Sequence, residues 1–301
     1  MTDSSRKPIL AYILSLPRSG STVLSAMLDK RKGIVSPPES CFPQVLGTVS
    51  PEERKNRRWM AALYIGSTFP PTQLSLDDAA SCMEGSNEDI LIALGRAVAA
   101  KLDRDPNEVR AVVWKTPRNV GMHAGPFSTP GKFIVLRRNP HNVFESQFRV
   151  GFGKNNRNPF RFSIFRESYE HAFARIPTER KLEIHYDDLP LVLTKVVEFL
   201  GLPDQGDWAG NQSSLDLAVE SCSWMSEVTK EFQNQDPKKR ARLDSKQVRT
   251  LNFAMKLARP TRWILGPARA YFDHQSLLWC LDRARHILEE ADAKTPPLAD
   301  A

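Results

Sequence analysis

A loop rich in hydroxyl groups follows the first apolar run of the chain. Residues 15–22 read SLPRSGST and come directly after the run PILAYIL. Backbone amides at the start of a helix, together with the hydroxyls of Ser19, Ser21 and Thr22, form a cradle for a phosphate-like anion. Arg18 adds a positive charge inside the same loop. The loop therefore predicts an anion-binding site, for which the alternative is a Ser/Thr-rich helix cap that holds no ligand.

The same loop differs from the Walker A pattern, which binds the β- and γ-phosphates of a nucleoside triphosphate. Walker A requires a glycine, four further residues and then Gly-Lys-Ser/Thr. Gly20, Ser21 and Thr22 stand at the last three positions, so a serine replaces the lysine, and the first glycine is absent. The loop therefore predicts an anion that needs neither that lysine nor the accompanying metal.

A second candidate for anion binding follows a later apolar run. In the stretch LRRNPHNVFESQF, Arg138 begins a turn, Asn139-Pro140 opens a helix, and Ser146 lies eight residues beyond Arg138. Two turns of helix carry Ser146 about 12 Å along the axis, but the long side chain of Arg138 starts ahead of the first turn. We expect both to reach one phosphate lying across the helix; the alternative is an ordinary Asn-Pro cap with a surface serine.

A carboxylate and a lysine complete the set of candidate site residues. Glu39 follows Pro37-Pro38 in the segment SPPESCF, where proline restricts the backbone. Lys115 ends the apolar run RAVVWK, and ligands of open parallel sheets bind at the carboxyl ends of the strands. Taken alone, Glu39 is typical of an exposed turn, and Lys115 reads equally well as a strand-end lysine that reaches solvent.

The elements that position these residues are predicted from alternating strand and helix patterns over the first two thirds of the chain. Four apolar runs read as strands that are buried on both faces, and amphipathic helical patterns lie between them. This alternation predicts an α/β fold with a central parallel sheet and flanking helices. The predicted strands are 9–16, 110–115, 131–137 and 181–186, and the predicted helices are 22–31, 89–102, 139–149 and 189–202.

The remaining third of the chain has a different composition. Residues 203–294 are polar with scattered tryptophans and end in a predicted helix at 274–294. We expect a single domain over 1–301, with an α/β core at 9–202 and a mainly helical C-terminal part at 203–294.

Composition limits the classes of partner and compartment. The chain of 301 residues carries a net charge of +7, which favours anionic partners, but its basic clusters at 55–58, 154–161 and 238–242 form no single stripe, so nucleic acid is not expected. The four cysteines are scattered without a CxxC pair, which indicates a reducing compartment and no zinc site. With neither a signal peptide nor a membrane-spanning run, we expect a cytoplasmic protein.

The two loops together resemble a known family. LPRSGST and RNPHNVFES are similar to the two nucleotide-binding motifs of the sulfotransferases, which use 3′-phosphoadenosine 5′-phosphosulfate (PAPS). WKTPRN (114–119) and IHYDDLPLVLTKVVEFLGL extend the resemblance over roughly 9–202, closer to the bacterial and tyrosyl-protein types than to the cytosolic type. The resemblance implies a P-loop NTPase-like sulfotransferase fold whose α/β core at 9–202 binds the nucleotide. It also implies that the first loop holds the 5′-phosphosulfate through Arg18, Ser19, Gly20, Ser21 and Thr22, and that Arg138 and Ser146 hold the 3′-phosphate.

Residues 203–294 are then the expected place for an acceptor site and a lid. The tryptophans Trp208, Trp224 and Trp263 in this part are candidates to line the acceptor pocket.

The resemblance also implies roles in catalysis. Pro117 occupies the position of the histidine base of cytosolic members, whereas bacterial members use a glutamate shortly after the first helix, which here is Glu39. Lys115 is then expected to stabilise charge on the bridging oxygen or the sulfonate, and Arg18 the charge that grows on the leaving phosphate. His123 and Glu84 are the next candidates for the base. One departure is Asn142, where the family has an aspartate.

The implied reaction moves a sulfuryl group from PAPS, without a metal, to a hydroxyl or amine of a small-molecule or carbohydrate acceptor. Two other functions stay open from the sequence. One is a P-loop kinase of a small molecule, which the serine at position 21 disfavours. The other is a nucleotide-binding protein without turnover.

Overall fold

The computed structural model describes residues 7–69, 74–116, 131–149, 158–203, 206–208, 213–214, 234, 236–260 and 266–294, with the backbone alone for 266–276. A five-stranded sheet is built from β1 (Ile9–Ser15), β2 (Ile34–Val35), β5 (Ala111–Lys115), β6 (Lys132–Arg137) and β7 (Lys181–His185). Its order is β2-β5-β1-β6-β7, and every pairing within it is parallel. The predicted α/β class with a central parallel sheet is confirmed.

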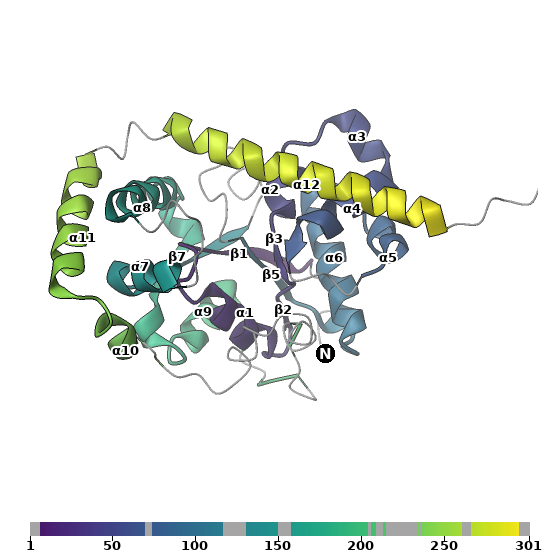
Figure 1. The fold of residues 1–301 in the computed structure, drawn as a ribbon. Helices are drawn as coiled ribbons and strands as arrows, with labels where there is room; N and C mark the ends of the chain where they lie inside the picture. The colour runs from purple at the N-terminus through teal and green to yellow at the C-terminus, as the bar shows by residue number, and fades with distance from the viewer. Residues whose placement is uncertain are drawn as a thin grey trace, which may run out of the picture.

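Helices lie on both faces of this sheet and along its edges (Figure 1). They are α1 (Ser21–Asp29), α2 (Phe42–Leu46), α3 (Pro51–Lys55), α4 (Arg57–Ser67), α5 (Leu76–Ser81), α6 (Asn87–Lys101), α7 (Pro140–Arg149), α8 (Pro159–Ala174), α9 (Leu193–Leu200), α10 (Asp236–Arg240), α11 (Ser245–Ala258) and α12 (Gly266–Lys294). Short 3₁₀ turns cover Pro106–Glu108, Thr178–Arg180 and Tyr186–Asp188. Among the described residues, no helix is long and apolar enough to cross a membrane.

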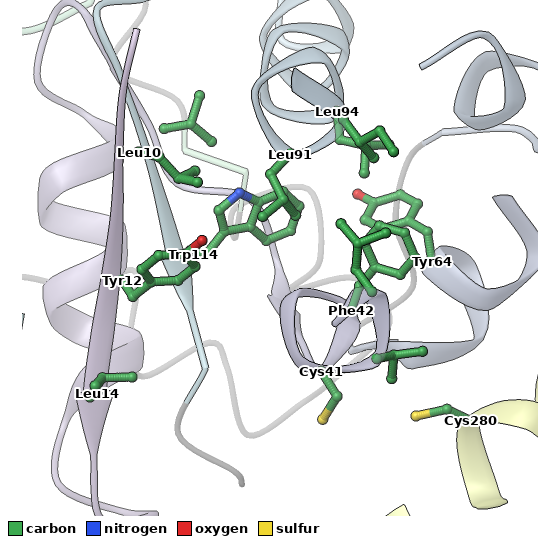
Figure 2. Packing of buried hydrophobic residues seen from close by; sticks show 14 of the residues in the cluster. Leu10, Tyr12, Leu14, Cys41, Phe42, Tyr64, Leu91, Leu94, Trp114 and Cys280 are labelled. Atoms are coloured by element: carbon green, nitrogen blue, oxygen red, sulfur yellow. The ribbon is translucent and has the colours of Figure 1, made fainter. Parts of the chain in front are cut away.

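The two faces of β1 belong to two separate hydrophobic clusters, because successive side chains of a strand point to opposite sides. Ala11 and Ile13 pack with apolar residues of α1 and α9. Leu10, Tyr12 and Leu14 pack in the larger cluster, which includes residues of α2, α4, α6, α8 and α12. Figure 2 shows part of this larger cluster, in which Trp114 of β5 lies between β1 and the side chains of α6. The sheet is thus covered on both sides.

The fourth predicted strand is less buried than expected. β7 lies at the edge of the sheet and pairs only with β6, and only Ile184 among its residues is buried. The expectation of a strand that is apolar on both faces is wrong here, because the face that carries Glu183 and His185 is polar and exposed. β6 and β1, which lie inside the sheet, are buried almost throughout.

Three short strands were not anticipated from the sequence. β2 adds an edge to the sheet beside β5. β3 (Glu39–Ser40) and β4 (Thr68–Phe69) form a separate antiparallel pair in which Glu39 lies opposite Phe69. Each of these strands has two residues, which is too short for an alternating pattern to be recognised. The β3–β4 pair matters for the site because it fixes the backbone at Glu39.

The C-terminal helices pack on elements of the first two thirds of the chain. α10 contacts α7, α11 contacts α8, and the long helix α12 lies across α4 (Figure 1). The capping box between Asp244 and Gln247 fixes the start of α11, because each of these side chains accepts a backbone N–H of the other residue. The contact with α7 holds α10 beside the helix that follows Arg138.

Candidate functional site

The loop after β1 presents the uncapped start of a helix. Arg18 and Gly20 have left-handed backbone conformations, with φ angles of 74° and 93°, and α1 begins at Ser21. No side chain caps the helix at Gly20, so its first backbone amides are left for another acceptor. A Cβ added at Gly20 would lie 2.4 Å from the ring of Tyr186, which leaves room for glycine alone. This geometry suits an anion, because the amide groups and the helix dipole favour negative charge there.

Lys115 and Glu39 meet at the start of α1. The Nζ atom of Lys115 lies 2.8 Å from the Glu39 carboxylate and donates a hydrogen bond of 2.8 Å to the Thr22 hydroxyl. The Lys115 side chain is 1% exposed and that of Glu39 is 21% exposed. Lys115 is therefore buried and does not extend into solvent. Chemically, a potential proton acceptor and a cation lie beside an anion-binding helix start.

The loops after β1 and β6 are joined by hydrogen bonds. The Nε atom of Arg18 donates to the Ser146 hydroxyl at 3.3 Å, and Arg138 Nη1 donates to the backbone carbonyl of Arg18 at 3.0 Å. The Arg138 guanidinium also stacks on the ring of Tyr186, with its carbon 3.9 Å from the ring centroid. β1 and β6 are neighbours in the parallel sheet, so their carboxyl ends bring these loops together.

A carboxylate that the sequence analysis did not single out lies on Arg138. Asp236, the first residue of α10, accepts from Arg138 Nε at 2.9 Å, accepts also from Nη2, and forms an ion pair with this arginine. The Asn142 side chain donates to the other carboxylate oxygen of Asp236 at 2.5 Å. In the sequence, Asp236 stands next to a basic run far from both loops, so no spacing signal connects it with them.

Lys239 adds a further cation to this group. Burial, then the nearby charges of Arg138 and Arg18, lower the pKa of Lys239 to about 8, against the opposing effects of Asp236 and Glu145. Lys239 lies in the C-terminal part at 203–294, where a lid was expected from the sequence. Lys239 lies close enough to Arg138 for their positive charges to interact.

Polar atoms at the ends of the two central strands have no partner within the described part of the chain. The hydroxyls of Ser15 and Thr116, at the carboxyl ends of β1 and β5, are buried and make no hydrogen bond. Gln147 of α7 uses its amide nitrogen to bond the carbonyl of Pro17 but leaves its Oε1 unpaired. Buried polar groups normally find partners, so unpaired donors and acceptors at this edge fit a site for a polar ligand.

The other predicted site residues lie elsewhere. Glu84 is exposed and forms an ion pair with Arg57, while His123 and Pro117 lie outside the described residues. Of the tryptophans proposed for an acceptor pocket, Trp208 is buried and donates to the carbonyl of Ile34, and Trp224 and Trp263 are outside the described residues. Trp208 thus has a structural contact, and the acceptor pocket stays a prediction.

The seven residues predicted to bind a nucleotide come from the β1–α1 loop and the start of α1, and from the turn after β6 and helix α7, which meet at the carboxyl edge of the sheet. They are Arg18, Ser19, Gly20, Ser21, Thr22, Arg138 and Ser146. Lys115 and Glu39 reach the same edge from β5 and β3. Within the described ranges, no group of three or more His, Cys, Asp or Glu side chains is arranged to hold a metal ion.

Comparison with known proteins gives one family and a set of distant structures. The model described as "Sulfotransferase family" matches residues 10–207. No curated protein matches the chain. Among solved structures, the sulfotransferase domain of the Synechococcus PCC 7002 olefin synthase is similar at 22% identity and a TM-score of 0.46, covering 84% of this chain and 96% of that one.

Two further structures show the same range of similarity. The sulfotransferase domain from the curacin biosynthetic pathway has 20% identity and a TM-score of 0.41, over 82% of this chain and 98% of that domain. The mouse sulfotransferase SULT7A1, complexed with PAP, has 14% identity and a TM-score of 0.38, over 89% of this chain and 90% of that chain.

Proposed function

Because the chain belongs to the sulfotransferase family, we propose that it transfers the sulfuryl group of PAPS to a hydroxyl or amine of a small-molecule or carbohydrate acceptor. The product nucleotide is 3′-phosphoadenosine 5′-phosphate (PAP). The observation that carries the proposal is the meeting of the uncapped α1 start, Lys115, Glu39 and Arg138 at one edge of the sheet. In this arrangement, cationic side chains and backbone amides can bind the two anionic groups of PAPS, and the Glu39 carboxylate lies beside them as a proton acceptor.

In this proposal, each of the two loops binds a different end of the nucleotide. The backbone amides after Gly20, the hydroxyls of Ser19, Ser21 and Thr22, and the Arg18 guanidinium hold the 5′-phosphosulfate. Arg138 and Ser146 hold the 3′-phosphate, with Lys239 beside them. The contact of Arg18 with Ser146 and the contact of Arg138 with the Arg18 carbonyl support this proposal, because these hydrogen bonds of 3.3 and 3.0 Å bring the two loops side by side.

PAPS supplies a sulfuryl group whose leaving group is the 5′-phosphate. Glu39 takes the proton of the acceptor while a bond forms between the acceptor oxygen or nitrogen and sulfur, and the bond between sulfur and the phosphate oxygen breaks. Lys115 and Arg18 neutralise the charge that develops on that phosphate oxygen. Because this charge is larger in the transition state than in the bound substrate, the interaction raises the rate of transfer. Lys115 also holds Glu39 in place through their ion pair.

The C-terminal part has a supporting role in this proposal. We place the acceptor site and a lid in residues 203–294, supported by the position of α10 beside Arg138. The cytoplasm is the proposed compartment, since the four cysteines of the chain are scattered without a CxxC pair.

The proposal is tested with the purified protein, PAPS and a panel of alcohols, phenols, amines and sugars. We expect release of PAP and a mass increase of one SO₃ group on at least one acceptor, with rates unchanged by EDTA. A magnesium requirement, or ATP binding as tight as PAP binding, would contradict the proposal and favour a kinase. PAP binding without turnover on any acceptor would favour a nucleotide-binding protein without catalysis.

A further inference from the structure

The carboxylate of Asp236 occupies the guanidinium edge that a phosphate would use. Arg138 Nε lies 2.9 Å from one carboxylate oxygen of Asp236 and 3.2 Å from the other, and Nη2 bonds the same group. The two side chains are 3% and 5% exposed. A bidentate contact of this kind is the one that arginine makes with phosphates as well as carboxylates.

The remaining surfaces of the Arg138 guanidinium are also in use. Its Nη1 donates to the carbonyl of Arg18 at 3.0 Å, and one of its faces lies on the ring of Tyr186. An incoming phosphate would therefore meet a guanidinium whose outward edge is already paired. Since two anions side by side in a buried site repel strongly, the phosphate and the Asp236 carboxylate compete for Arg138.

Asp236 is held beside Arg138 by two amide side chains, of which Asn142 donates to its carboxylate. Its backbone N–H donates to Asn234, whose side chain in turn donates to the exposed Asp187, and α10 packs on α7. Lys239 lies one turn further along α10, where burial and then the nearby charges of Arg138 and Arg18 lower its pKa. A phosphate that replaced the carboxylate would restore the negative charge that this group of cations requires.

We propose that Asp236 is an internal competitor of the 3′-phosphate, which pairs Arg138 when no nucleotide is bound and lowers the affinity of the site for PAP. The proposal rests on the function proposed above, in which Arg138 binds the 3′-phosphate. Its consequence is that release of PAP is assisted, because the Asp236 carboxylate replaces the leaving phosphate on Arg138. Asp236 thereby sets how much the 3′-phosphate contributes to nucleotide affinity.

The experiment measures the dissociation constants of PAP and 5′-AMP, which lacks the 3′-phosphate, by calorimetry. Asp236→Asn should bind PAP about ten-fold more tightly than the wild type, chiefly through slower dissociation, because one charge-assisted competitor is removed. Its 5′-AMP affinity should be unchanged, which also reports that the variant is folded. Asp187→Asn is the matched control: it removes a carboxylate that bonds Asn234 but does not contact Arg138, and should leave both constants unchanged.

Unchanged or weaker PAP binding by Asp236→Asn, with 5′-AMP binding intact, would overturn the proposal. If the single variant does not fold, Arg138→Ala and Arg138→Ala/Asp236→Asn supply the test. In that background the second substitution should have no effect on PAP affinity, whereas a persisting rise would show that Asp236 acts by charge at a distance and not by competition for Arg138. Failure of the proposed function is a separate result: the wild type would show no preference for PAP over 5′-AMP.

Discussion

The ammonium of Lys115 contacts two groups with different tasks in the proposed reaction. It lies 2.8 Å from the Glu39 carboxylate and 2.8 Å from the hydroxyl of Thr22, in the first turn of α1. Solvent screens a buried cation much less than a surface one, so its attraction to both neighbours is stronger than that of an exposed lysine. One buried side chain therefore aligns the proposed base with the loop that would hold the sulfuryl group.

Replacing Glu39 by glutamine keeps the size of the side chain but removes its ability to accept a proton. We expect Glu39→Gln to lower kcat by about 10²–10⁴, the usual contribution of a general base, with PAP affinity nearly unchanged. The loss should be larger for an aliphatic alcohol than for a phenol, because the phenol proton is already acidic. The measurement compares kcat for the two acceptors and the dissociation constant of PAP.

Glu52→Gln is the control for this variant, since Glu52 is an exposed surface carboxylate that pairs with Lys55. It should retain wild-type turnover on both acceptors. Near wild-type turnover of Glu39→Gln on the aliphatic alcohol would remove Glu39 from the mechanism, and His123 would then be the next residue to test.

At the scale of elements, helix α10 brings two opposite charges to Arg138 from adjacent turns. Asp236 pairs with Arg138, and Lys239 lies near both arginines of the site. α10 has only five residues, so its place depends on contacts with α7 and on the segments around it more than on its own helix propensity. The contacts of α10 with its neighbours therefore determine that Asp236 pairs with Arg138.

The lowered pKa of Lys239 predicts a pH dependence of nucleotide binding. Because this pKa is about 8, Lys239 is mostly charged at neutral pH and loses its proton as the pH rises through that value. The phosphates of PAP stay fully ionised there, since their last pKa is about 6. Bound phosphate favours the charged ammonium, so PAP affinity should fall several-fold between about pH 7 and about pH 9.

Lys239→Gln should bind PAP more weakly at pH 7 and should lose most of this slope. Lys238→Gln is the matched control, because Lys238 is the exposed neighbour on the same helix. Titrations of PAP at several pH values distinguish the two variants. The charged groups that face Lys239 are Arg138, Arg18, Asp236 and Glu145. An equal slope in the wild type and in Lys239→Gln would contradict the assignment of the pH dependence to Lys239.

At the scale of the whole molecule, a buried ion pair ties the segment after residue 203 to the α/β core. Asp29, at the end of α1, accepts from Arg104 at 3.0 Å and from the backbone N–H groups of Ser36 and Ser214 at 2.7 and 2.6 Å. The Arg104 guanidinium also lies over the ring of Trp208 at 5.3 Å. The same carboxylate thus joins the first helix, the strand region beside it and the C-terminal part.

Arg104→Met should destabilise the protein by about 3–5 kcal/mol, because the buried carboxylate of Asp29 would lose its counter-charge. Lys55→Met, which breaks the exposed pair with Glu52, should change the free energy of unfolding by less than about 1 kcal/mol. Equilibrium unfolding in urea measures both. Equal small effects of the two substitutions would contradict a linking role for the buried pair.

The local parts of the site were predictable from the sequence because their signals lie within one strand, loop and helix. The strand at 9–15 with its glycine-containing loop, and Arg138 before the helix at 140–149, follow from apolar runs, helix-start residues and spacing. The parallel sheet followed from the alternation of strands and helices. These features depend on neighbours within a few residues, so the order of residues determines them.

Only the tertiary structure decided which distant charges meet. Lys115 was as consistent with a solvent-exposed lysine as with a site residue until the short β3–β4 pair placed Glu39 against it. The contact of Asp236 with Arg138 depends on how α10 packs against α7, and no periodicity or motif records that packing. The physical reason is that burial and strand order, set by the whole hydrophobic core, fix the distances between segments, whereas the sequence states only which charges are available.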